Sequence, residues 1–291
     1  MPELTRVTKR LAVLGHPVSH SLSPAMQNAA LEALGLSEWR YEARDLAPKE
    51  FAERAREMPK QGFVGANVTI PHKQAALAIA DQASEAARGI GAANTLSFAD
   101  GAIRADNTDA GGLLAALPRA VEESTALVLG AGGAARAAVW ALAGRGARVT
   151  VWNRTGERAD ELVRVLAGAG AGTPAEGRLT AVSAEQARAG SFALIVNCTS
   201  VGMKDEDPFE HLPLDPERFD AEIVLVDLVY AGSQSRLVRE ARARRATAVD
   251  GLEVLVRQGA ESLRIWTGMD PPLEVMREAA KQGKEIRWRT H

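Results

Sequence analysis

A glycine-rich segment in the middle of the chain constrains the fold more than any other feature. The apolar run Ala126–Leu129 leads into Gly130-Ala131-Gly132-Gly133-Ala134, and an alanine-rich stretch of helical length connects this segment to a second apolar run that starts at Val149. Glycines between a buried strand and a helix allow a tight turn, and backbone N–H groups at the helix N-terminus can then approach an anion. The segment predicts a strand, turn, helix and strand that bind the pyrophosphate of a dinucleotide.

The residues after the second apolar run indicate which dinucleotide binds. An acidic residue would accept hydrogen bonds from an NAD ribose, whereas this chain has Asn153, Arg154 and Thr155, with Arg158 one helical turn later. Arginine favours a 2′-phosphate, so the predicted cofactor is NADP. The alternative is an ordinary strand–helix–strand turn followed by a solvated arginine. The spacing of roughly 20 residues between the glycines and Arg154 favours the cofactor.

Composition limits the classes of protein that the chain can belong to. Its 291 residues, 46% of them hydrophobic, suffice for two domains with a core each. A net charge of −2 gives no reason to expect nucleic acid or an acidic membrane as partner. The single cysteine, Cys198, excludes an internal disulfide and fits a reducing cytoplasm. We expect no membrane span and no signal peptide, because no apolar run is long enough for a span and residues 1–10 lack an apolar core. We also expect no metal site, because Pro17 separates His16 from His20 and so argues against a shared helical face.

The alternation of apolar runs and helical patterns predicts an α/β fold with mostly parallel sheets. Asp100-Gly101 between two apolar runs predicts a hairpin, and residues 81–90 read as helical. Ser23 is expected to cap a helix that opens at Pro24. We expect one domain at residues 1–108 and a doubly wound, Rossmann-type domain at 109–250. The two helices after Gly251 are expected to return to the first domain, which places 251–291 there.

Three polar clusters fall at predicted strand ends, where open α/β sheets bind ligands. They are Ser19–Pro24, Gly65–Lys73, and Asn94 together with 106–109. Taken singly, each has an ordinary explanation: Ser23 and Asp109 as helix caps and Lys73 as a solvated lysine.

Taken together, the motifs resemble the shikimate dehydrogenase family from residue 10 to about residue 268. The resemblance rests on many short motifs in the same order, which is more specific than any single one. These are Ser21-x-Ser23-Pro24, Asn67-Val68-Thr69-x-Pro71-x-Lys73, Ala93-Asn94-Thr95, Asn107-Thr108-Asp109, Gly130 to Ala134, Asn153-Arg154-Thr155, Asn197-x-Thr199-Ser200-x-Gly202, and Asp250-Gly251-Leu252 with Gln258.

The resemblance implies an NADP-dependent oxidoreductase that acts on a CH–OH group. It would interconvert 3-dehydroshikimate and shikimate in chorismate and aromatic amino-acid biosynthesis. The family has an N-terminal catalytic α/β domain completed by C-terminal helices, an NADP domain, and substrate between them. Lys73 would be the catalytic acid/base, paired with Asp109. The substrate-binding residues would be Ser21, Ser23, Thr69, Lys73, Asn94, Asp109, Tyr230 and Gln258.

The resemblance also implies which residues bind NADP. They would be Gly130, Ala131, Gly132, Gly133, Ala134, Asn153, Arg154, Thr155, Arg158, Thr199 and Ser200, with Leu228 and Gly251 at the nicotinamide. Glu85 matches a position that lies near the cofactor in some members of the family. The chain departs from the family at Glu253 and Val254, where a small residue or proline and then methionine are common. Packing at the nicotinamide end is the feature that this departure affects.

Two alternatives stay open at this point. One is a quinate/shikimate dehydrogenase with relaxed NAD(P) use, against which Arg154 argues. The other is a non-catalytic NADP-binding regulator on the same scaffold, which would have no need for Lys73, Asp109 and Gln258 together. The oligomeric state is open as well, with a homodimer among the states considered.

Overall fold

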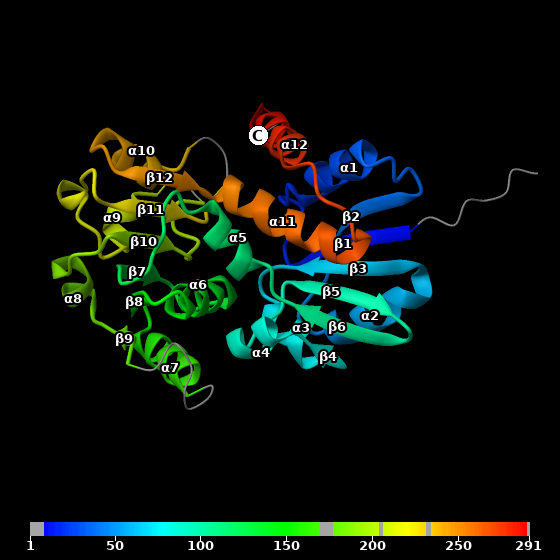
Figure 1. Ribbon diagram of the computed structural model, residues 1–291, viewed down its shortest axis with the longest axis horizontal. Coiled ribbons are helices and arrows are strands. Elements are labelled where there is room, and N and C mark those ends of the chain that lie inside the picture. The colour runs from blue at the N-terminus through cyan, green and yellow to red at the C-terminus, as the bar shows by residue number, and fades with distance from the viewer. Residues whose placement is uncertain (1–8, 169–176, 204–205, 231–233, 290–291) are drawn as a thin grey trace, which may run out of the picture. The chain divides into compact units, whose positions relative to one another are not determined.

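The computed structural model describes residues 9–168, 177–203, 206–230 and 234–289, which divide into two compact units (Figure 1). The first unit contains the described residues up to Thr108 and Val256–Gly283. The second contains Asp109–Leu255 and the end of the chain from Lys284. Residues 251–255 thus group with the second unit, whereas the sequence analysis placed them in the first domain.

The first unit is built around a six-stranded mixed sheet of order β2-β1-β3-β5-β6-β4. β1 pairs in parallel with β2 and β3, while β5 is antiparallel to both β3 and β6. Its elements are β1 (Lys9–Gly15), α1 (Ser23–Ala33), β2 (Trp39–Asp45), α2 (Phe51–Glu57), a 3₁₀ turn (Met58–Gln61), β3 (Phe63–Val68), α3 (Lys73–Ala78), β4 (Gln82–Ala83), α4 (Glu85–Ile90), β5 (Thr95–Ala99) and β6 (Ala102–Asp106). Two later helices contribute residues to it, α11 (Gly251–Thr267) and α12 (Leu273–Arg289).

The predicted hairpin is confirmed: β5 and β6 are joined through Asp100 and Gly101, which both have positive φ, as a tight turn of this type requires. The prediction of one helix over 81–90 is wrong in its first part. Gln82 and Ala83 form the edge strand β4 against β6, and helix α4 begins only at Glu85. Pairing with a distant strand overrides the local helical pattern there.

The two faces of the first sheet are buried differently. On one face, Ala12, Leu14 and Ala66 join an apolar cluster that includes α2, α3 and α4. On the other face, α11 lies close enough that a side chain at Gly65 would overlap the Trp266 ring. The Trp266 indole N–H donates to Leu96 O at 3.0 Å. The second face therefore depends on residues from the far end of the chain.

The expectation that Ser23 caps α1 is wrong. Ser23 is the first helical residue, so the cap position is Leu22, whose side chain makes no capping hydrogen bond. The Ser23 backbone N–H instead donates to Ser21 Oγ at 3.2 Å. Proline at the first turn supplies one position with no N–H to satisfy, so the helix can start without a capping serine.

The second unit is built around a six-stranded, all-parallel sheet of order β12-β11-β10-β7-β8-β9. Numbered from its own first strand this is the 3-2-1-4-5-6 order of a dinucleotide-binding sheet, so the predicted doubly wound fold is confirmed. Its elements are α5 (Asp109–Ala116), β7 (Thr125–Leu129), α6 (Gly133–Gly144), β8 (Arg148–Trp152), α7 (Gly156–Ala167), β9 (Leu179–Ala181), α8 (Ala184–Ala189), β10 (Leu194–Asn197), α9 (Pro208–His211), a 3₁₀ turn (Pro216–Arg218), β11 (Val224–Asp227), α10 (Arg236–Ala243) and β12 (Thr247–Asp250).

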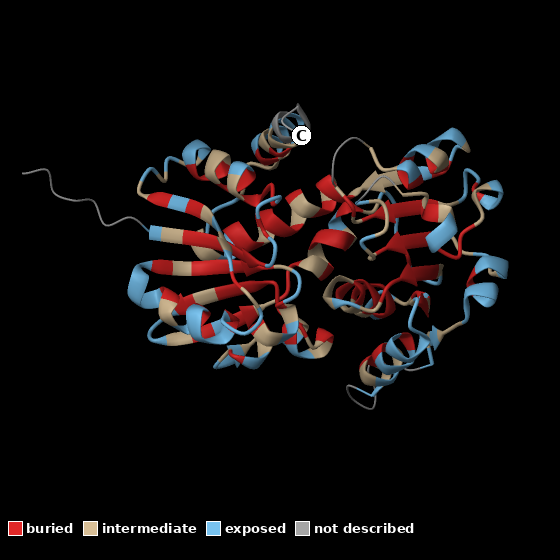
Figure 2. Ribbon diagram, turned by 180° about the vertical axis from the view of Figure 1, so that it is seen from behind, coloured by how far each residue is buried: buried red, intermediate tan, exposed pale blue. Residues whose placement is uncertain are grey.

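Helices bury both faces of this sheet, as a parallel sheet requires. Along β7, Ala126 and Val128 join a cluster with α5, α6 and α7, whereas Leu127 and Leu129 join a cluster with α8 and α10. Accordingly, β10 and β11 are buried throughout and β7 is buried after its first residue, as the red ribbon in Figure 2 shows. None of the described helices is long and apolar enough to cross a membrane.

Candidate functional site

The loops after β1 and β3 bring Ser21, Ser23 and Thr69 to one end of the first sheet. Ser21 and Ser23 are 8% and 5% exposed, and they are joined by the bond from the Ser23 N–H to Ser21 Oγ. Thr69 donates its backbone N–H to Leu14 O at 2.8 Å, and its Cγ2 lies beside Gly15, where a Cβ would approach it to 2.5 Å. The structure therefore places the predicted substrate hydroxyls on two neighbouring strand ends.

Lys73 and Asn94 are held next to each other through the backbone. Lys73 is the first residue of α3 and is half-buried, and its carbonyl oxygen accepts from the Ala93 N–H at 2.8 Å. Asn94 follows directly in the chain and is only 2% exposed. An acid/base candidate and a polar binding residue are thus adjacent within the first unit.

Asn94 and Gln258, separated by most of the sequence, form a buried side-chain pair. Asn94 Nδ2 donates to Gln258 Oε1 at 3.0 Å and to Thr108 Oγ1 at 3.0 Å. Asn94 Oδ1 accepts from the Thr108 N–H at 2.8 Å. Gln258, on α11, is 9% exposed. The structure thus brings together two of the predicted substrate-binding residues, and their role in binding stays a prediction.

Behind this pair lies a polar network that the sequence analysis did not identify. Asn67 Nδ2 donates to Ser262 Oγ at 2.8 Å, and Asn67 Oδ1 accepts from the Tyr41 hydroxyl at 2.8 Å. Ser262 Oγ also lies 2.8 Å from Thr95 Oγ1 and 3.0 Å from Thr108 Oγ1. Buried polar groups that satisfy one another fix side-chain positions. The sequence signal for Ser262 was its position four residues after Gln258, which places both residues on the same face of a helix.

In the second unit, the glycine turn has the geometry of an anion site. Gly130 has φ +110°, and a Cβ there would lie 3.3 Å from the Cys198 carbonyl group. Its N–H donates to Trp152 O at 2.7 Å. Gly132 is exposed, precedes the 12-residue helix α6, and would meet no atom within 4 Å if it carried a Cβ. The turn lies between β7 and β10, where the strand order reverses, so the residues present fit a pyrophosphate.

The predicted ribose-reading residues lie at the end of β8. Asn153 Nδ2 donates to Thr155 O at 2.9 Å, which closes the turn between β8 and α7. Arg154 and Arg158 are exposed on this turn and on the first turn of α7. Two cationic side chains beside a helix N-terminus suit a phosphate group. Glu85 is exposed in the first turn of α4, in the first unit.

A buried Asn197–Asp227 pair holds the loops after β10 and β11, which carry the other predicted cofactor residues. Asn197 Nδ2 donates to Asp227 Oδ1 at 2.8 Å, and Asn197 Oδ1 accepts from the Thr199 N–H and hydroxyl at 3.1 and 2.7 Å. Asp227 Oδ2 accepts from Ser235 Oγ at 2.5 Å. Gly251 approaches Leu228 so closely that a Cβ would overlap the Leu228 carbonyl oxygen. A carboxylate that ends a wholly apolar strand was the sequence signal for Asp227.

The buried carboxyl of Asp227 predicts a pH-dependent stability. Burial raises the pKa of Asp227, opposed by hydrogen bonds from Ser235, Val229 and Asn197. An unfolded aspartate has a pKa of about 3.9, so above that pH the folded state retains a proton that the unfolded state has lost. The stability contributed by the protonated form is therefore lost as the pH rises through the raised pKa.

Asp227→Asn lacks this dependence, so we expect its stability relative to wild type to increase as the pH rises above about 3.9, the pKa of an unfolded aspartate. The measurement is the urea midpoint of both proteins at each pH. Asp160→Asn, on the exposed side of α7, is the control. A constant difference between Asp227→Asn and wild type would show that Asp227 does not titrate abnormally.

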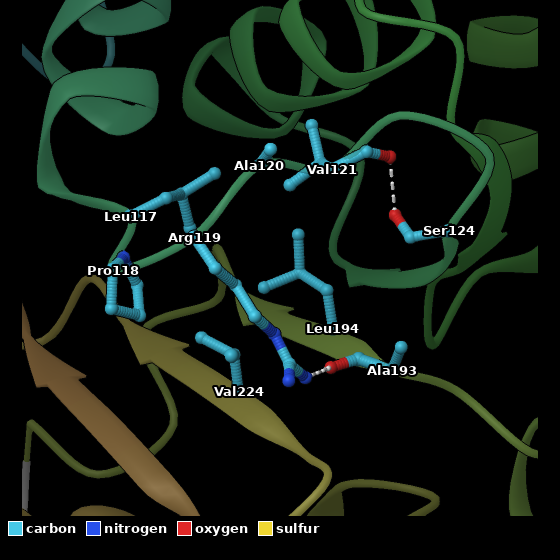
Figure 3. A pocket seen from close by; sticks show the side chains of 9 residues that line it. All are labelled: Leu117, Pro118, Arg119, Ala120, Val121, Ser124, Ala193, Leu194 and Val224. Atoms are coloured by element: carbon cyan, nitrogen blue, oxygen red, sulfur yellow. Dashed lines mark hydrogen bonds between the residues drawn. The ribbon is translucent and has the colours of Figure 1, made fainter.

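Two hollows lie away from these loops, at the amino ends of the second sheet's strands. Figure 3 shows the smaller, about 20 Å³, in which Arg119 reaches past Leu194 and Val224 to the Ala193 carbonyl. A larger, more open hollow of about 510 Å³ lies beside Arg188, Arg218 and Ile223. Ligands of open α/β sheets bind at the carboxyl ends, so neither hollow is the candidate site.

Asp109 and Tyr230 belong to the second unit. Asp109 is the first residue of α5 and directly follows Thr108, and Tyr230 follows β11. Both side chains are half-buried. The predicted pairing of Asp109 with Lys73 stays a prediction. Among the described residues there is no group of three or more histidine, cysteine, aspartate or glutamate side chains that could hold a metal ion.

Three family profiles match the sequence in the order that the motifs suggest. They are the shikimate dehydrogenase substrate binding domain over residues 13–96, shikimate/quinate 5-dehydrogenase over 114–178, and the shikimate 5′-dehydrogenase C-terminal domain over 251–281.

Curated relatives cover nearly the whole chain. A shikimate dehydrogenase (NADP⁺) of Methanothermobacter thermautotrophicus is 40% identical over 282 residues, 96% of this chain and 98% of the relative. A shikimate dehydrogenase (NADP⁺) of Thermus thermophilus is 45% identical over 275 residues, 94% of this chain and 98% of the relative.

A solved structure agrees with the sequence relatives. The crystal structure of shikimate 5-dehydrogenase from Thermus thermophilus, in complex with NADP(H) and shikimate, has a TM-score of 0.83 and 42% identity. The match covers 95% of this chain and all of the other chain.

Proposed function

This chain belongs to the shikimate dehydrogenase family, and we propose that it catalyses the NADP-dependent, reversible reduction of 3-dehydroshikimate to shikimate. The observation that carries the proposal is the buried Asn94–Gln258 pair beside the backbone of Lys73. Two carboxamides can read the hydroxyls of a polyol ring, and the adjacent lysine can exchange a proton with its oxygen. An NADP-binding regulator would need none of the three.

We assign NADP binding to the second unit and most substrate contacts to the first, with Asp109 and Tyr230 of the second unit as the proposed exceptions. In the second unit, the turn Gly130–Ala134 would hold the pyrophosphate, and Arg154 with Arg158 would hold the 2′-phosphate. Thr199 and Ser200 would contact the cofactor from the loop that Asn197 fixes. Leu228 and Gly251, which lie against each other at the ends of β11 and β12, would face the nicotinamide. Tyr230 and Thr69 complete the proposed substrate contacts.

The bound cofactor supplies the hydride, and the protein supplies the proton. During reduction, the Lys73 ammonium would donate a proton from Nζ to the substrate carbonyl oxygen as that oxygen gains electron density. Asp109, the proposed partner, would favour the protonated lysine through its negative charge. Asn94 and Gln258 would hold the ring by its hydroxyls, while Ser21 and Ser23 would bind its carboxylate. In the reverse direction Lys73 would take the proton back.

A turnover assay tests the proposal directly. Purified protein is mixed with shikimate and NADP⁺, and formation of NADPH is followed by its absorbance. Quinate and NAD⁺ in parallel arms measure any relaxed specificity. Binding of NADP⁺ without turnover of shikimate or quinate would favour the regulator over the enzyme.

Two further properties are proposals. We place the protein in the cytoplasm, because a single cysteine and the substrate of a biosynthetic pathway fit that compartment. Fractionation of cells would test this. We retain the homodimer as the oligomeric state, and sedimentation equilibrium would distinguish it from a monomer.

Ser21→Ala is expected to raise KM for shikimate by about ten- to a hundredfold, the range for losing a hydrogen bond to a charged group. A substrate analogue without the carboxylate should already bind poorly to wild type and lose little more in the variant. Inhibition constants for the analogue provide this comparison.

Ser97→Ala is the matched control for Ser21→Ala. Ser97 Oγ is also buried in the first unit, and it has no hydrogen-bond partner among the described residues. Removal of the Ser97 hydroxyl should leave KM for shikimate and the inhibition constant of the analogue unchanged. If Ser21→Ala weakened the analogue and shikimate by the same factor, the hydroxyl would not read the carboxylate.

A further inference from the structure

Asp45, the last residue of β2, uses both carboxylate oxygens to hold the loop that follows the neighbouring strand β1. Oδ1 accepts from His16 Nδ1 at 2.6 Å, and Oδ2 accepts from the Val18 N–H at 3.1 Å. The register places Asp45 opposite Gly15, directly before His16. One side chain thus fixes two points of the loop, one through its backbone and one through a ring.

The same loop presents Ser21. The Ser21 N–H donates to Val18 O at 3.0 Å, and Ser21 Oγ accepts from the Ser23 N–H. Asp45, Val18, Ser21 and Ser23 therefore form a continuous series of hydrogen bonds from the end of β2 to the start of α1. At its other end the loop is joined to the β3 loop, since the His16 N–H donates to Ile70 O at 3.0 Å.

We propose that Asp45 is a positioning residue for substrate binding, whose contacts with His16 and Val18 hold Ser21 in place for the substrate carboxylate. The inference rests on the proposed function, in which Ser21 binds that carboxylate. The Asp45 side chain is 48% exposed, and an exposed ion pair contributes little to folding stability. Its effect is expected on the geometry of the loop and hence on KM.

The charged and titratable groups around Asp45 define how the contact responds to pH. The His16 hydrogen bond, followed by that from Val18, holds the pKa of Asp45 below its usual value, so the carboxylate is ionised at neutral pH. His72, directly before α3, donates from Nε2 to Leu46 O at 2.7 Å and stacks on Phe51. Burial lowers the pKa of His72, which keeps that ring neutral.

The other charges nearby have partners elsewhere or sit in the loop itself. Arg44, which precedes Asp45 on β2, pairs with Glu42. His20 lies in the loop one residue before Ser21, and Lys73 directly follows His72. His20 and Lys73 are unchanged in every variant below, so ratios between variants and wild type remove their contribution.

Asp45→Asn makes the role of His16 measurable. The Val18 N–H can only donate, so the amide oxygen of the asparagine must face Val18, and its NH₂ group then faces His16 Nδ1. That contact is favourable only while His16 Nδ1 carries no proton. In wild type, the Asp45 carboxylate can accept a hydrogen bond from a protonated His16 Nδ1 at any pH at which the Asp45 carboxylate is ionised.

We therefore expect the ratio of KM for shikimate in Asp45→Asn to KM in wild type to stay within about twofold while His16 Nδ1 carries no proton, and to rise about tenfold when acidification protonates it. The double variant His16→Ala/Asp45→Asn should lose this rise. A KM ratio that does not change with pH would overturn the role of the His16–Asp45 contact.

Asp45→Ala removes both contacts and should raise KM for shikimate about five- to twentyfold at every pH, with kcat and KM for NADP⁺ within about twofold of wild type. Glu42→Ala is the matched control, because Glu42 lies on the same strand and pairs with Arg10 of β1 at 3.0 Å. The control should leave KM for shikimate unchanged. Equal changes in kcat and both KM values for Asp45→Ala would indicate general damage and overturn the proposal.

A double-mutant cycle separates this inference from the proposed function. If Asp45 acts through Ser21, Asp45→Ala should raise KM little further in a Ser21→Ala background. If Ser21→Ala raises KM and Asp45→Ala does not, the serine site stands and the positioning role fails. If neither substitution changes KM, the serine loop is not the carboxylate site, and that part of the proposed function fails as well.

Discussion

Replacing Lys73 by alanine is expected to lower kcat by about 10² to 10⁴, the range for removing a positioned acid/base. The fold should survive, because Lys73 is half-buried at the first position of α3, its observed backbone bond from Ala93 does not involve the side chain, and alanine favours a helix. Steady-state kinetics with shikimate and NADP⁺ measure kcat, and circular dichroism checks the fold.

Two further variants interpret that result. Lys60→Ala removes an exposed lysine from the same unit and should leave kcat unchanged. Lys73→Arg keeps a positive charge on a group that does not release its proton, so it should not restore turnover. Wild-type kcat in Lys73→Ala would remove Lys73 from the chemistry, and full activity in Lys73→Arg would assign it an electrostatic role alone.

Arg154→Ala is expected to raise the dissociation constant of NADPH by about ten- to a hundredfold, since a hydrogen bond to a charged group contributes about 1.5 to 3 kcal/mol. Arg154 is exposed on the turn that Asn153 and Thr155 close at the end of β8, where we propose that the 2′-phosphate binds. NADH lacks that phosphate and should bind about as it does to wild type. Fluorescence titrations with both cofactors give the two dissociation constants.

Arg188→Ala, on exposed α8 in the same unit, controls for the loss of one positive charge. It should affect neither cofactor. Equal weakening of NADPH and NADH by Arg154→Ala would mean that the arginine supports the turn and does not read the phosphate.

Features set by neighbouring residues could be predicted from the sequence. Gly130 and the residues after it indicated the nucleotide turn, and Asp100-Gly101 indicated the hairpin, because both depend on local backbone conformation. The strand β4 could not be predicted in this way. Gln82 and Ala83 are extended only because β6 pairs with them.

In the candidate site, too, local motifs could be predicted from the sequence, whereas contacts between distant residues could not. The motifs located Asn94 and Gln258, yet the Asn67–Ser262 hydrogen bond joins residues so distant in sequence that no local pattern relates them. Asp45 was also missed, because its role depends on the register of β2 against β1. The error at Ser23 has a smaller scale: the helix begins one residue earlier than predicted, so Ser23 is its first residue and Leu22 occupies the cap position.

The return of α11 to the first unit has a consequence for the newly made chain. Until Gln258, Ser262 and Trp266 leave the ribosome, the face of the first sheet at Gly65 and Asn67 has no cover from them and its network is incomplete. Residues 109–255 must be synthesised first, which takes roughly 7 to 30 s at about 5 to 20 residues per second. For that time the first strands present apolar surface to chaperones and to other nascent chains. The second unit, continuous from Asp109 to Leu255, can bury its sheet before the first is complete.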